Sequence, residues 1–160
     1  MLWACILLPQ LAMDGVLRQR SDSETPLALL SGSPQRRVLQ AVNPAARALG
    51  LKPGLSLTAA QALTHDFATC KYDVGQIERW HRFLAAWAYG FSAQVSLHYP
   101  RCLLLEVQSS LGLFGPWPSF EARLRTELAA LGFQHRIAAA PNTRRRERGG
   151  VGENATVVRS

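Results

Sequence analysis

Lys and Arg are the residues of this sequence best suited to a chemical role, the binding of an anionic partner. The 160-residue chain carries 18 Lys and Arg against 11 Asp and Glu, which gives a formal net charge of +7. Such an excess attracts polyanions, and nucleic acid is the foremost of them. The pair Arg36-Arg37 and the segment 144–148 are dense positive stretches. The alternatives are a codon bias toward Arg and, for Arg36-Arg37, a solvated loop face.

The histidines and cysteines show no spacing typical of a metal site. The four histidines are scattered along the chain: His65, His81, His98 and His135. The three cysteines, Cys5, Cys70 and Cys102, form no CxxC pair. We therefore predict neither a zinc site nor a disulfide framework, and the composition suits a reducing cytoplasm. The short apolar N-terminus, 1–9, predicts neither a signal peptide nor a membrane span.

Apolar runs and turn residues predict the elements that must position these side chains. We expect strands over 2–8, 26–30, 38–42, 67–72, 94–97, 101–107 and 133–139. We expect helices over 9–17, 44–49, 75–89 and 120–131, and a short one that ends at 63. Asn43, Ser56 or Thr58, and Ser119 are the expected helix caps, and Gly132 ends the last helix.

Three expectations concern packing. On helix 75–89 one apolar face is expected, made of Ile77, Trp80, Phe83, Leu84, Trp87 and Ala88. The stretch 109–118 is predicted to be a loop, with Leu113–Trp117 anchored to the core or, alternatively, serving as a partner site. The segment 143–160 has no apolar periodicity and is predicted to be a disordered Arg- and Gly-rich tail. Helices and strands alternate without a regular βαβ repeat, which predicts an α+β fold.

Three segments, in this order, resemble the Y-family (DinB/UmuC-type) translesion DNA polymerases: Asn43–Leu55, Phe91–Ser110 and Gly132–Asn142. Gly32–Val38 matches in outline the family strand that precedes the first of them. The resemblance implies a ferredoxin-like palm sheet with helices on one face over 1–142. It also implies a small fingers-like α/β insertion at about 18–73. The chain is then truncated before the thumb and little finger, and a frameshifted reading of a longer gene would explain the 143–160 sequence.

The resemblance also implies where catalytic acids would stand. Family members bind two divalent ions through carboxylates on neighbouring palm strands, for phosphoryl transfer. The motif alignment puts Ile6 and Leu8 at the first acid positions and Arg101-Cys102 at the second pair. Glu106 aligns outside the metal pair. Because alkyl, guanidinium and thiol groups do not suit magnesium, we expect no metal, no cofactor and no polymerase activity.

The family's nucleotide contacts are partly kept. Arg47 matches the Arg that touches the incoming triphosphate, while Pro44 and Thr143 replace an aromatic and a basic residue. We expect a phosphate-binding surface in the fingers-like part, made of Arg36, Arg37, Arg47 and Lys52.

In lacking these acids, the chain resembles the ImuB-type members of the family, and Leu7–Ala12 looks like their N-terminal signature. That resemblance implies a non-catalytic accessory protein of DNA repair and damage-induced (SOS) translesion synthesis, cytoplasmic and nucleoid-associated. Its implied partners are DNA, an error-prone replicative-type polymerase and a RecA-like protein, with a sliding clamp bound only by the full-length protein and no membrane. The alternatives are a ferredoxin-like binding module unrelated to repair and an active nucleotidyltransferase.

Overall fold

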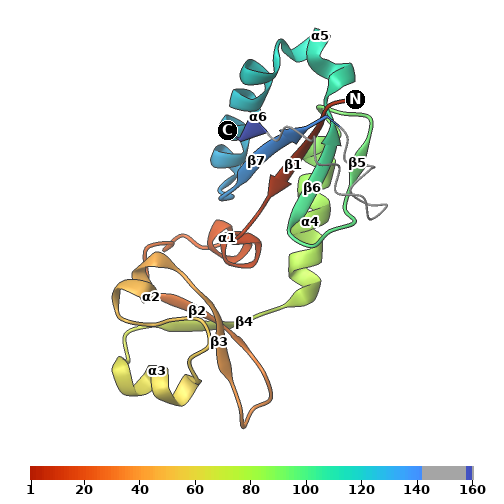
Figure 1. The fold of residues 1–160 in the computed structure, drawn as a ribbon. Coiled ribbons are helices and arrows are strands. Elements are labelled where there is room, and N and C mark those ends of the chain that lie inside the picture. The colour runs from red at the N-terminus through yellow and green to blue at the C-terminus, as the bar shows by residue number, and fades with distance from the viewer. Residues whose placement is uncertain (142–157, 160) are drawn as a thin grey trace. The chain divides into compact units, whose positions relative to one another are not determined.

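The computed structural model describes residues 1–141 and 158–159 (Figure 1). The chain divides into two compact units, one made of residues 1–11 and 78 onward, the other of residues 12–77. The fingers-like part expected over 18–73 falls inside the second unit. Thr143 and most of the segment 143–160 lie outside the described residues.

The first unit is built on a sheet with the strand order β5-β6-β1-β7-β8. Its strands are β1 (Trp3–Leu7), β5 (Val95–Ser96), β6 (Cys102–Glu106), β7 (Arg136–Ala140) and β8 (Val158–Arg159). Every neighbouring pair is antiparallel. Without β8, the order is that of a ferredoxin-like sheet, in which the first strand lies between the third and the fourth. β8 gives strand pairing at two residues of the segment predicted to be disordered.

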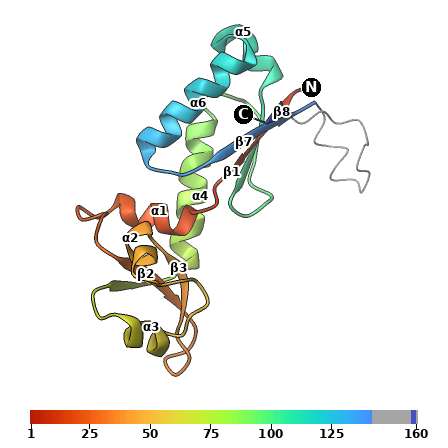
Figure 2. The ribbon, with the colours of Figure 1, turned by 60° about the vertical axis from the view of Figure 1, so that its left-hand side comes forward.

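Two long helices cover one face of this sheet: α4 (Val74–Ala88) and α6 (Trp117–Leu131). Both views show α4 and α6 on the same side of the strands (Figures 1 and 2). Helix α6 buries Phe120, Leu124 and Leu128, and it ends at Gly132, whose φ of 90° is the left-handed cap that glycine favours.

The predicted apolar face of α4 is only partly right. Leu84 and Ala88 are buried as expected, and Ala85 is buried with them. Phe83, by contrast, is 39% exposed and packs its ring edge-on against Trp80, with 5.5 Å between ring centroids. The covered stripe is thus narrower than the apolar pattern indicates.

The segment predicted to be a loop over 109–118 is mostly helical. It contains the 3-10 helix η1 (Gln108–Ser110) and the short helix α5 (Leu111–Phe114), and α6 begins at Trp117 rather than after Ser119. The reason is tertiary: the Phe114 ring lies 4.9 Å from Phe120 and 5.2 Å from Phe91. Core anchoring therefore holds for Phe114.

The second unit is a small sheet with helices on both faces. Its strands are β2 (Leu27–Ser31), β3 (Val38–Val42) and β4 (Ala68–Lys71), in the order β3-β2-β4. β2 pairs antiparallel with β3 and parallel with β4. The helices are α1 (Leu11–Arg18), α2 (Pro44–Ala48) and α3 (Leu57–Leu63).

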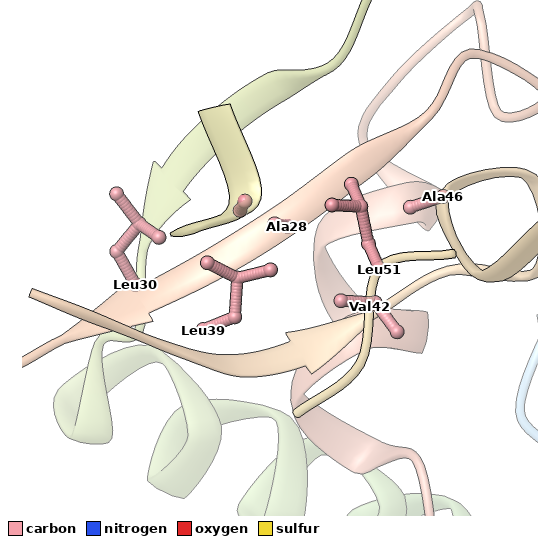
Figure 3. Packing of buried hydrophobic residues seen from close by; sticks show 7 residues of the cluster. Ala28, Leu30, Leu39, Val42, Ala46 and Leu51 are labelled. Atoms are coloured by element: carbon pink, nitrogen blue, oxygen red, sulfur yellow. The ribbon is translucent and has the colours of Figure 1, made fainter. Parts of the chain in front are cut away.

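Each face of this sheet has its own core. One face gathers Ala28, Leu30, Leu39 and Val42 against residues of and around α2 and α3 (Figure 3). The opposite face places Leu27 and Leu29 against residues of α1, including Met13.

Asn43 joins α2 to the sheet of the second unit. Its side-chain oxygen accepts from the backbone N–H of Ala46 (2.9 Å), which caps α2, and from that of Leu27 (2.9 Å). Its amide donates to the Thr25 carbonyl (2.8 Å), and the residue is 1% exposed. Of the two expected caps for α3, Ser56 is the one used, since its hydroxyl accepts from Ala59 N–H (3.1 Å).

The predicted α+β fold class is confirmed, with a ferredoxin-like sheet that carries helices on one face and a small α/β unit inserted after β1. Among the described residues, no helix has the length and apolar character needed to cross a membrane.

Candidate nucleic-acid interface and the polymerase-like strand pair

The first predicted acid positions, Ile6 and Leu8, lie in the apolar interior of the first unit. Both side chains are 0% exposed. Ile6 pairs in register with Leu103 of β6 and Ile137 of β7. Because side chains alternate along a strand, Ile6 points to the face that α4 and α6 cover. A carboxylate at Ile6 would therefore be buried among aliphatic groups.

Cys102 lies on the face of the same sheet opposite to that of Ile6. There it pairs in register with Leu7 and clusters with Trp3 and Leu104. Its Sγ is 3.1 Å from Cys5 Sγ. The hydrogen bond with Cys5, together with burial, raises the pKa of the Cys102 thiol far above its ordinary value. The structure therefore does not bring Cys102 together with the first predicted positions.

Arg101, the other member of the second predicted pair, immediately precedes β6. It is exposed and has a φ of 57°, which is uncommon for a residue with a side chain. Its carbonyl accepts from the Leu8 N–H (2.8 Å), so its backbone closes the end of the β1–β6 ladder. Its charge stands beside the strand pair and would repel a cation.

Glu106, the one acid on β1 or β6, is used in the fold. It is 2% exposed, and its Oε1 accepts from the Ser109 backbone N–H (3.0 Å) at the start of η1. This bond satisfies a donor that the beginning of a helix leaves unpaired. The carboxylate thus supports the turn between β6 and α5.

The donors of this strand pair do not fit a magnesium ion. Magnesium needs several hard oxygen ligands, whereas thiols are soft. β1 and β6 offer the two thiols of Cys5 and Cys102 and the single carboxylate of Glu106. Across the part of the chain that the structure describes, no three His, Cys, Asp or Glu side chains are grouped so as to hold a metal ion.

The predicted phosphate-binding cations all lie in the second unit and are all exposed. Arg36 and Arg37 are in the β2–β3 connection, Arg47 is in the last turn of α2, and Lys52 follows α2. Within the described residues, none of the four has an ion pair. Their charges are therefore available to an anionic partner.

One cavity of about 310 Å³ lies at the end of the second unit's sheet. Of the four predicted cations only Arg37 lines it, and the further polar lining residues are Ser31 of β2 and Thr69, Cys70 and Lys71 of β4. The structure does not gather the four predicted residues into one pocket. Lys71 carried no recognisable signal in the sequence, because its place beside Arg37 depends on the pairing of β4 with β2.

Comparisons with known proteins agree with this architecture. The impB/mucB/samB family model matches residues 16–144. The chain belongs to the impB/mucB/samB family. Among curated proteins, none matches the sequence.

Solved structures of Y-family DNA polymerases share the fold. The post-insertion binary complex of Dbh DNA polymerase matches with a TM-score of 0.72 and 14% identity, over 89% of this chain and 42% of that polymerase chain. DinB from Sulfolobus solfataricus matches with a TM-score of 0.66 and 16% identity, over 89% and 42%. The insertion ternary complex of Dbh gives a TM-score of 0.69 and 15% identity, over 89% and 43%. The chain thus spans less than half the length of these polymerases.

Proposed function

We propose that this chain is part of a non-catalytic, polymerase-like accessory protein of DNA repair, of the ImuB type, acting in damage-induced translesion synthesis. The observation that carries the proposal is the composition of the β1–β6 strand pair. In place of hard oxygen ligands it holds apolar side chains, a thiol pair and one carboxylate engaged in a cap. Membership of the family and the Y-family fold support the link to DNA.

The proposed contact with DNA is electrostatic. Arg36, Arg37, Arg47 and Lys52 are exposed cations without ion pairs among the described residues, so they suit backbone phosphates. Such contacts bind many sequences with similar strength, which an accessory protein that must meet DNA at any lesion requires.

The wider role is proposed by family resemblance. The longer protein would bring together an error-prone replicative-type polymerase, a RecA-like protein and a sliding clamp. It would act in the cytoplasm, at the nucleoid. Pull-down of each purified partner by the intact protein is the corresponding test.

A titration of Mn²⁺ into the purified chain, followed by electron paramagnetic resonance, tests the non-catalytic assignment. This measurement does not require the chain to bind duplex DNA. We expect no stoichiometric site, and Glu106→Gln should bind Mn²⁺ as weakly as the matched surface variant Glu78→Gln. A stoichiometric site that is lost only in Glu106→Gln would contradict the proposal. So would primer extension that requires magnesium and stops on chelation.

A further inference from the structure

The cavity of the second unit lies between the ends of β2 and β4 and the β2–β3 connection. Its volume is about 310 Å³, near the lower end of the range for small-molecule sites. Leu30, Gly32, Arg37, Thr69 and Lys71 are among its lining residues. Two cations and the hydroxyls of Ser31 and Thr69 therefore line one cavity that has an apolar residue in its wall.

The cations that flank the cavity are not neutralised. Within the described residues, neither Arg37 nor Lys71 forms an ion pair. Lys71 pairs in register with Leu30, and Thr69 lies two residues earlier on the same face of β4. An anion between Arg37 and Lys71 would meet a guanidinium, an ammonium and a hydroxyl, which is the donor set that phosphate groups favour.

The walls of the cavity are fixed by backbone bonds. The Arg37 carbonyl accepts from Leu57 N–H (2.9 Å), and Tyr72 N–H donates to the Leu30 carbonyl (2.7 Å). Gly32 has a φ of 98°, and a Cβ there would come within 2.3 Å of the Arg36 carbonyl oxygen. The β2–β3 connection therefore folds back closely on itself, and this holds the backbone of Arg37 in place.

Leu30 supplies the apolar part of the wall. It is 7% exposed and belongs to the core cluster of the second unit. Figure 3 shows it at the opposite end of the cluster from Ala46, at the edge where the cavity begins. A sugar or base edge packed against Leu30 would lose contact with water while its phosphate stays between the cations.

We propose that this cavity binds the phosphate group of one nucleotide, supplied by a single-stranded nucleic acid. The inference rests on the proposed function and names a specific place on its DNA-binding surface. The same chemistry would accept a free nucleotide, so the test separates the two sources.

Fluorescence anisotropy of a labelled oligothymidylate tests the pocket. Arg37→Gln and Lys71→Gln should each weaken binding about fivefold at low salt. Because both cations meet the same phosphate, the double variant should reduce the slope of log affinity against log salt by about 0.7, and each single variant should reduce it by less. Arg82→Gln, an exposed charge on α4, removes the same charge and should change affinity by less than about twofold. Circular dichroism of each variant checks that it is folded.

A substitution that leaves the charge unchanged distinguishes binding in a defined pocket from general attraction of DNA by positive charge. Thr69→Leu fills space and removes the hydroxyl without changing the charge, and it should weaken binding about threefold. If Thr69→Leu leaves the affinity unchanged and Arg82→Gln lowers it as much as Arg37→Gln does, the proposal of a phosphate-binding pocket is wrong. The proposal that the chain binds DNA would still hold. If the unaltered chain binds no oligonucleotide, both proposals fail.

Nuclear magnetic resonance identifies the ligand's source. The amide signals of Thr69 and Lys71 should shift with the oligonucleotide and, at higher concentration, with thymidine monophosphate. Equal affinity for both ligands would assign the pocket to free nucleotides instead of a strand. Shifts with thymidine alone would overturn the phosphate assignment.

Discussion

Substituting Asp into β1 should reveal which face of the sheet each residue occupies. Ile6→Asp removes a side chain that is 0% exposed between Leu103 and Ile137. The lost burial costs about 2–3 kcal/mol. An unpaired carboxyl group in its place costs about 1–3 kcal/mol more. The total of about 3–6 kcal/mol is a large part of the stability of an ordinary domain.

Leu7→Asp is the matched control, one residue away on the opposite face of the sheet. Leu7 is 39% exposed, so its loss of burial costs about 1 kcal/mol. Its register partner on β7 is Arg136, which gives the new carboxylate an opposite charge worth about 0.2–1 kcal/mol. Leu7→Asp should therefore be nearly as stable as the unaltered chain.

Urea unfolding followed by tryptophan fluorescence measures the difference. We expect Ile6→Asp to lie at least about 2 kcal/mol below Leu7→Asp at pH 7. A buried carboxyl has a raised pKa in the folded state, so its neutral form is tolerated at low pH and its cost grows as the pH rises above about 4. The deficit of Ile6→Asp relative to Leu7→Asp should therefore shrink at pH 4. Equal stabilities at both pH values would refute the assignment of faces.

Three further results are expected. Gly32→Ala should destabilise the chain by about 2 kcal/mol or more in the same urea assay, because its new Cβ meets a backbone oxygen. Gly50 has a φ of 89° but open space around it, so Gly50→Ala should destabilise the chain by only about 1 kcal/mol. Asn43→Ala should cost about 2–4 kcal/mol, since it leaves two N–H donors and a carbonyl unpaired, and Asn43→Asp should recover part of that loss; a neutral Asn43→Ala would contradict the role. Cys102 should alkylate more slowly than Cys70 at pH 8 in peptide mapping, because its pKa is raised; faster alkylation of Cys102 would show that its thiol is more open than the structure has it.

Local sequence patterns predicted most of the fold. Apolar runs located the strands, and the capping residues Asn43 and Ser56 marked two helix starts that the structure confirms. The helices within 108–118 were missed because they are stabilised by contacts of Phe114 with Phe91 and Phe120. Both contact residues lie outside the segment, so its own sequence does not indicate them. Propensity alone does not report such anchoring.

The candidate site was less predictable. A motif alignment places Ile6 and Cys102 at related positions, but it does not say which face of a strand a residue occupies. The pairing of Leu7 with Cys102 settles that point, and a shift of one residue reverses it. Lys71 reaches the cavity beside Arg37 only because β4 joins β2 in parallel after two intervening helices. Pairing of this kind has no local signal.

The salt dependence of single-stranded DNA binding tests the central claim most directly. If Arg36, Arg37, Arg47 and Lys52 each meet one phosphate, log affinity should fall with log salt at a slope of about −2.8. Affinity for oligothymidylate should then drop about 50-fold between 50 and 200 mM salt, with or without chelator. Binding that stays flat across this range, or that requires a divalent metal, would contradict a phosphate-binding, non-catalytic polymerase-like protein.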